Sequence, residues 1–158
     1  AKYTYKTFTL QFVDLFFPGY TALNQDYFNF KNSTTGHCSE LGISFNGTEE
    51  VPLSVYGGMI MYGAAIDPDP DENEKLNRSL YFELKYTGSL KDYGYNIFAG
   101  LTPGKSTLYG TEGFDLVNIG ASAVKTINVS ENFRVPVRLT LSTNPSAEKI
   151  YFSVIISL

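Results

Sequence analysis

The chain is poor in the residues that build catalytic or cross-linked sites. Its 158 residues include one cysteine, one histidine and no tryptophan. A lone Cys38 excludes an intrachain disulfide and a cysteine-rich metal site. The neighbouring His37 is the only base for a serine–histidine–aspartate site, and no G-x-S-x-G motif accompanies it. Adjacent residues of an extended segment point to opposite faces, so His37 cannot activate Cys38. We expect no enzyme activity, cofactor or metal.

Charge and long apolar runs are also scarce. Charged residues make up 18% of the chain and the formal net charge is −4, an acidic balance that argues against nucleic-acid binding. No apolar run approaches the roughly 18–20 residues of a transmembrane helix, so no membrane insertion is expected. A hydrophobic content of 43% excludes a disordered chain. The length predicts one domain, residues 1–158.

What the chain has is alternation. Leu80, Phe82, Leu84 and Tyr86 alternate with more polar residues, as in a half-buried strand. Two further alternating runs, at 135–142 and 150–158, flank the turn 143–146 and predict a C-terminal antiparallel hairpin. Pro136 cannot donate to a ladder, so its strand should lie at an edge or begin beside a bulge.

Further strands are predicted at 8–16, 27–31, 41–46, 51–56, 59–64, 93–99, 114–119 and 124–129. Together these predict an all-β, antiparallel β-sandwich, Ig-like or jelly-roll, of about eight to ten strands. The acidic run 67–74 predicts a solvated loop or one helical turn. As a calcium loop it lacks glycine at its sixth position and glutamate at its twelfth.

The N-terminus is unusually apolar, and residues 1–17 form a candidate exchanged strand. Tyr3 and Tyr5 share one parity and Phe8, Leu10 and Phe12 the other, which predicts a bulge or a change of sheet near Thr7. Such a strand pairs either within its own sandwich or with a neighbouring subunit. The candidate assembly residues are Tyr3, Tyr5, Phe8, Leu10, Phe12, Val13 and Leu15.

The C-terminal hairpin provides the candidate acceptor. Its alternating apolar residues would line a groove for the inserted strand, formed by Val137, Leu139, Phe152, Val154 and Ile156. Strand complementation of this kind joins pilus subunits. The leading hypothesis is therefore a secreted or cell-surface structural subunit that self-assembles into a filament, as a homo-oligomer through strand exchange.

Glycan-related signals support an extracellular location. Four N-x-[ST] sequons place candidate glycosylation sites at Asn32, Asn46, Asn77 and Asn128. The first residue, Ala1, is what leader cleavage would leave. The sequons are equally ordinary turn residues if the source does not glycosylate.

Two other functions remain open. Six tyrosines cluster in the middle third: Tyr56, Tyr62, Tyr86, Tyr93, Tyr95 and Tyr109. They suit either stacking on sugars in a monomeric adhesin or carbohydrate-binding module, or cross-strand packing. A viral capsid or spike domain would share the fold. Two S-x-x-K matches, at 122–125 and 146–149, lie in strand or turn surroundings and lack the companion motifs of the serine–lysine enzymes.

Overall fold

The computed structural model describes residues 1–17, 26–31, 35–63, 66–68 and 76–157, and these form an all-β fold. The predicted all-β, antiparallel fold class is confirmed. The acidic-loop, helical-turn and calcium-loop predictions concern residues 67–74, of which Asp67 and Pro68 belong to a short strand and the others lie outside the described residues. Among those described, no helix is long and apolar enough to cross a membrane.

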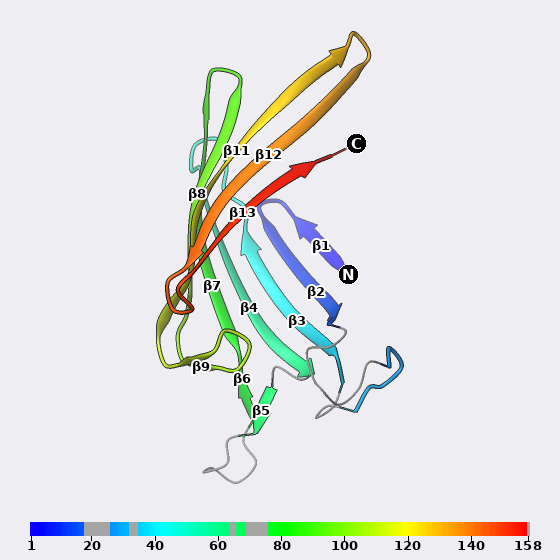
Figure 1. Ribbon diagram of the computed structural model, residues 1–158, viewed down its shortest axis with the longest axis vertical. Coiled ribbons are helices and arrows are strands. Elements are labelled where there is room, and N and C mark those ends of the chain that lie inside the picture. The colour runs from blue at the N-terminus through cyan, green and yellow to red at the C-terminus, as the bar shows by residue number, and fades with distance from the viewer. Residues whose placement is uncertain (18–25, 32–34, 64–65, 69–75, 158) are drawn as a thin grey trace.

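One nine-stranded antiparallel sheet dominates the molecule (Figure 1), with the order β1-β2-β3-β4-β7-β8-β11-β12-β13. Each strand pairs with its predecessor and its successor in the main sheet, an up-and-down order. Its strands are β1 Lys2–Tyr5, β2 Phe8–Phe16, β3 His37–Phe45, β4 Leu53–Gly63, β7 Leu80–Leu90, β8 Tyr93–Thr102, β11 Asp115–Ser130, β12 Phe133–Asn144 and β13 Lys149–Ile156.

Two short ribbons interrupt the up-and-down order. Strands β5 (Ile66–Pro68) and β6 (Leu76–Arg78) pair with each other between β4 and β7. Strands β9 (Lys105–Ser106) and β10 (Thr111–Glu112) pair between β8 and β11. The β9–β10 ribbon is held by Ser106, whose hydroxyl donates at 2.8 Å to Ser79, the residue between β6 and β7.

The N-terminal parity change has a simple cause that differs from the prediction. β1 and β2 are separate strands joined by a tight turn at Lys6 and Thr7, with Lys6 at φ 52°. The turn reverses the chain, and Tyr5 pairs with Phe8 across it. Tyr3, Tyr5 and Phe8 therefore share one face, where a bulge in a single strand was predicted.

The C-terminal hairpin prediction is confirmed, since β12 pairs with β13 from Val137↔Ile156 to Asn144↔Lys149. Pro136 lies one residue beyond that ladder, and its carbonyl oxygen still accepts a hydrogen bond from the Ser157 amide at 3.1 Å. The predicted strand at 27–31 is absent, because residues 26–31 form a turn. The predicted pairs at 51–56 and 59–64, and at 114–119 and 124–129, are each one long strand, β4 and β11.

The sheet is strongly curved, so that β1 and β13 lie on the same side of the view in Figure 1. The β11–β12 hairpin projects beyond its neighbours, because its pairing with β8 ends at Lys125 while β11 continues to Ser130. Strand β1 forms one edge of the sheet and β13 the other.

Candidate functional site

The pairing register sorts the side chains of the main sheet into one apolar and one polar face. Residues opposite each other in a ladder share a face, and one row reads Phe8, Phe45, Val55, Leu84, Ala99 and Ile119. The next row reads Leu53, Tyr86, Ile97, Ala121, Leu141 and Phe152. We call the surface formed by these and parallel rows the apolar face.

The apolar face is the exposed one. Leu84 is 51% exposed, Ile97 55% and Phe152 68%. On the other face, Thr9 of β2 is 3% exposed and Ser122 of β11 is 7% exposed, whereas both sides of β13 are exposed. Only four hydrophobic side chains of the described residues are buried, at 3% to 9% exposure: Cys38, Ile60, Val117 and Val135. The usual arrangement of a protein in water, with apolar groups inside, is reversed in this sheet.

Tyrosines on the polar face lie flat over glycines of neighbouring strands. A Cβ at Gly100 would come within 2.1 Å of the Tyr81 hydroxyl, and one at Gly42 within 2.4 Å of that of Tyr56. Glycine therefore leaves the space that each phenol ring needs. The rings reach over one strand to partners on the next: Gln11 Nε2 donates to Tyr56 at 3.2 Å and Asn118 Nδ2 donates to Tyr81 at 3.1 Å.

Carboxylates accept the hydrogen bonds of these phenols. Tyr56 donates to Glu40, and Tyr81 donates to Glu83 at 2.7 Å. Burial, together with the Glu40 hydrogen bond, raises the pKa of Tyr56 to about 12, and burial raises the pKa of Tyr81 further. Tyr81 stacks on Tyr109 of the β9–β10 ribbon, with centroids 5.4 Å apart. Both phenols stay neutral donors at physiological pH.

The polar face is the concave one. A hollow of about 550 Å³ is lined by residues of five consecutive strands of the sheet, from β1 to β7. Its lining is almost entirely polar and comprises Lys2, Gln11, Ser44, Asn46, Ser54, Val55, Tyr56, Glu83, Lys85 and Thr87. The apolar face carries two smaller hollows of about 390 and 400 Å³, beside β11 and β12, and is convex elsewhere because the sheet curves toward the polar side.

Apart from Thr143 in the Phe8 row, polar residues of the apolar face lie at two levels along the strands, and past the second level the face continues with Ile127 and Val135. At one end lie Asp14 and Ser39, which are ladder partners. At the other end Lys125 pairs with Tyr93, and its Nζ lies 3.1 Å from Asp92 and 4.3 Å from the centre of the Tyr93 ring. Five apolar rows separate these ends, one each through Phe12, Leu10, Phe8, Leu53 and Leu139. Successive rows are two residues apart, so the ends are roughly 40 Å apart along the strands.

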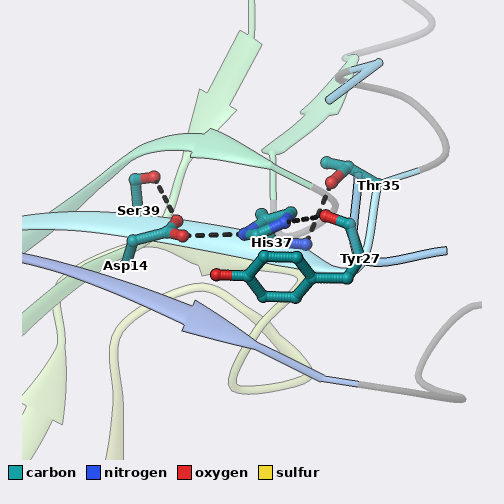
Figure 2. Close-up of polar contacts among 5 residues, drawn as sticks. All are labelled: Asp14, Tyr27, Thr35, His37 and Ser39. Carbon is teal, nitrogen blue, oxygen red and sulfur yellow. Dashed lines mark hydrogen bonds and ion pairs between the residues drawn. The ribbon is translucent and has the colours of Figure 1, made fainter. Parts of the chain in front are cut away.

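A second cluster, of polar groups around His37, occupies the Asp14 end (Figure 2). His37 Nδ1 lies 2.7 Å from Asp14 Oδ2, and Nε2 lies 2.7 Å from the carbonyl oxygen of Tyr27. Ser39 donates to the other Asp14 oxygen at 2.6 Å, and the amide of His37 donates to Thr35 Oγ1 at 3.0 Å. The cluster joins β2 and β3 to the turn at 26–31.

This cluster is not arranged for nucleophilic catalysis. The Ser39 hydroxyl donates to Asp14 rather than to His37, so no base faces the serine. Cys38 is buried, which raises the pKa of its thiol, and its place on β3 puts it on the face opposite His37. Across the part of the chain that the structure describes, no group of three His, Cys, Asp or Glu side chains could hold a metal.

The predicted assembly residues fall on both faces. Tyr3, Tyr5, Phe8, Leu10 and Phe12 lie on the apolar face, and Val13 and Leu15 on the other. The predicted acceptor residues Val137, Leu139, Phe152, Val154 and Ile156 lie together on the apolar face of β12 and β13. The two sets are not in contact, because they occupy opposite edges of the sheet.

The other candidate residues are dispersed. Tyr86, Tyr93 and Tyr95 lie on the apolar face and Tyr56 on the polar face, so the tyrosines do not form one surface for a sugar. Ser122 and Lys125 of the first S-x-x-K match have opposite parity on β11. Of the sequons, Asn46 and Asn128 are exposed, but Asn46 Nδ2 donates to Thr9 at 2.8 Å. Asn77 lies on β6, and Asn32 is outside the described residues.

Comparisons with protein-family models, curated proteins and solved structures found no match. Function must therefore be argued from the two faces and the His37 cluster. Sequence reasoning missed the Tyr81–Glu83–Asn118 and His37–Asp14 groups, because Asn118 is 37 residues from Tyr81 and Asp14 is 23 residues from His37. The available signal was the repeated combination of glycine and tyrosine on the polar side of the strands.

Proposed function

We propose that this chain forms part of a membrane-embedded β-structure, with its convex apolar face against lipid acyl chains. The observation that carries the proposal is the reversal of polarity: the covered, concave face is polar and the exposed, convex face is apolar. Contiguous apolar surfaces of this extent mark contact with a nonpolar partner. The proposal departs from the sequence-based expectation of no membrane insertion, which rested on the lack of a helix-length apolar run.

Lipid fits this face better than a second protein layer does. A protein partner would have to wrap around a convex surface that extends over all nine strands, whereas a bilayer surrounds a convex surface without any matching shape. The roughly 40 Å between the polar ends becomes roughly 28 Å at a ~45° strand tilt, close to the ~30 Å hydrocarbon core. Tyr93 and Lys125 at one end are residue types that anchor proteins at the membrane surface.

Vesicle binding tests the proposal. The full chain, refolded in the presence of phosphatidylcholine vesicles, should float with them in a density gradient and stay bound after an alkaline carbonate wash. It should also acquire strand-rich circular dichroism only with vesicles or detergent. A monodisperse, folded chain in plain buffer that sediments away from vesicles would contradict the proposal. Ser54→Leu, which changes the concave face, is a control that should leave flotation unchanged.

The open edges of the sheet favour an addition to this proposal, which is that a strand from another copy pairs with one edge. Within the sheet that the described residues form, strands β1 and β13 each have one unpaired side, and unpaired backbone groups are not tolerated in hydrocarbon. Strand directions alternate, so the first and ninth strands run the same way and could pair with each other only in parallel. Antiparallel completion of an edge needs a strand from outside this sheet. A second copy, as the assembly hypothesis proposes, supplies one, and a cell-surface location is compatible with it.

A further inference from the structure

His37 faces a hydrogen-bond acceptor at each ring nitrogen. Nδ1 lies 2.7 Å from a carboxylate oxygen of Asp14, and Nε2 lies 2.7 Å from the backbone carbonyl of Tyr27 (Figure 2). A carbonyl oxygen and an ionised carboxylate can only accept. Neutral imidazole has one N–H and could satisfy one of these partners. Both contacts are satisfied together only by the doubly protonated ring.

The surroundings suit a buried cation. The His37 side chain is 2% exposed, while Asp14, its charge partner, is 39% exposed. The imidazole stacks on Phe30 with centroids 4.7 Å apart, and the rings of Phe16 and Tyr27 lie 5.0 Å away. A buried charge is tolerable when it is paired and hydrogen-bonded, and aromatic faces add cation–π attraction.

We propose that His37 is a proton-operated latch: its doubly protonated ring fastens the turn at 26–31 to β2 and β3, and loss of one proton releases it. Tyr27 contacts the ring of His37 through its carbonyl oxygen and Phe30 stacks on that ring, while the side chains of Phe28 and Phe30 stay 79% and 57% exposed. Release would expose the rings that surround His37, namely Phe16, Tyr27 and Phe30. This inference does not depend on what covers the apolar face.

Asp14 is the charged group bonded to the ring. The other titratable groups on the surrounding elements are Tyr62 on β4 and Asp26, Tyr27 and Lys31 of the turn. Cys38 and Glu40 belong to the opposite face of β3. The hydrogen bond to the Tyr27 carbonyl and the Asp14 carboxylate raise the pKa of His37 above 6.5. Hydrogen bonds from Ser39 and His37 lower the pKa of Asp14 below 3.8.

The signs of these shifts define when the latch is closed. A raised histidine pKa stabilises the closed turn fully below pH 6.5, and this stabilisation is lost as the pH rises through the raised value. A lowered aspartate pKa stabilises it above pH 3.8, and this is lost as the pH falls through the lowered value. The latch is therefore strongest in mildly acidic solution and opens on the alkaline side.

Nitrogen NMR of the imidazole tests the latch directly, because the chain has one histidine. In the full chain labelled with ¹⁵N-histidine, both ring nitrogens should show the shifts of protonated nitrogens to a pH above 6.5. Between pH 6.5 and the midpoint of the imidazole titration, hydrogen-exchange protection of the Asn29 and Thr35 amides, corrected for intrinsic exchange, should fall by up to about tenfold per pH unit, since one proton is linked, and it should level off above that midpoint. A singly protonated ring at pH 6, or protection unchanged through the transition, would overturn the proposal.

Two variants separate the latch from a simple packing role. Asp14→Asn should lower the midpoint of the imidazole titration and of the amide protection together, while Ser39→Ala, which leaves the carboxylate in place, should move both much less. His37→Gln cannot donate in two opposite directions and should leave the turn unprotected at every pH. Equal shifts in Asp14→Asn and Ser39→Ala would contradict the charge-based mechanism, and the wild-type titration stands even if a variant does not fold.

Discussion

At the scale of single residues, the polar face depends on glycines that leave room for aromatic rings. Tyr81 crosses β8 above Gly100 and reaches Asn118 on β11. Its hydroxyl both donates to Glu83 and accepts from Asn118, so the ring is fixed between strands that are not neighbours in the sheet. Because Gly100 has no Cβ, the Tyr81 ring can cross β8, and its hydrogen bond to Asn118 links β7 to β11.

Gly100→Val should destabilise the sheet by about 1–3 kcal/mol, because the new Cβ would displace the Tyr81 hydroxyl and break its hydrogen bonds. Urea unfolding followed by circular dichroism measures this loss. Gly104→Val is the matched control, since nothing lies within 4 Å of a Cβ there. Equal stability of the two variants would contradict this prediction, because it would show that the Tyr81 ring can move aside without loss of stability.

The Asp14–His37 pair predicts that the difference in stability between wild type and Asp14→Asn is a bell-shaped function of pH. Wild type should be more stable in the window from pH 3.8 to 6.5, where Asp14 is ionised and His37 protonated. The difference should shrink at lower pH as Asp14 gains its proton and at higher pH as His37 loses one. Thermal melts of both proteins across this range measure it. A difference independent of pH would assign the loss to packing alone.

At the scale of elements, the central strands have one lipid-compatible side and one polar side, whereas β2 and β13 also carry apolar residues on the polar face. Strand β7 illustrates this, since Phe82, Leu84 and Tyr86 lie on the apolar face and Glu83, Lys85 and Thr87 on the concave face. If the membrane proposal holds, side chains at adjacent positions of one strand therefore face lipid and water in turn.

Leu84→Arg should cost about 2–4 kcal/mol in vesicles, the range for a cation near the bilayer midplane. Thr87→Arg, on the concave face of the same strand, should change stability by less than ~0.5 kcal/mol. Unfolding in urea with the chain bound to phosphatidylcholine vesicles measures both. Leu84 is half exposed, so if it faces water, Leu84→Arg should behave like Thr87→Arg, and that result would contradict the lipid-facing assignment.

At the scale of the whole molecule, the two open edges determine how the sheet is completed. Nine alternating strands leave β1 and β13 parallel to each other. An antiparallel β13–β13 contact between two copies would satisfy one edge through a twofold axis. Residues near that axis would lie opposite themselves in the partner.

Single cysteines on β13 test this contact in a Cys38→Ala background. One of Tyr151→Cys, Ser153→Cys or Ile155→Cys should form a disulfide-linked dimer under mild oxidation in vesicles, because only the position at the axis brings like residues together. Thr87→Cys on the interior strand β7 should remain monomeric. Failure of all three positions would leave β13 to pair with something other than its own copy.

The sequence by itself determined the strands and their two-sided character. Alternation is a local property, so Leu80–Tyr86 and the C-terminal hairpin could be predicted from a few neighbouring residues. The same was true of the opposite orientation of His37 and Cys38. The prediction failed at 27–31 and at Thr7, where a turn determines the local structure and apolar content is uninformative.

Only the tertiary structure decided which side of the sheet is covered. A period of two is the same for a strand buried in a sandwich and for one with its apolar side outward, so alternation cannot give the direction of curvature. That direction depends on registers between distant strands and on tyrosines resting over Gly42 and Gly100. Likewise, Asp14 meets His37 across 23 positions of sequence, a distance that only the β2–β3 ladder closes.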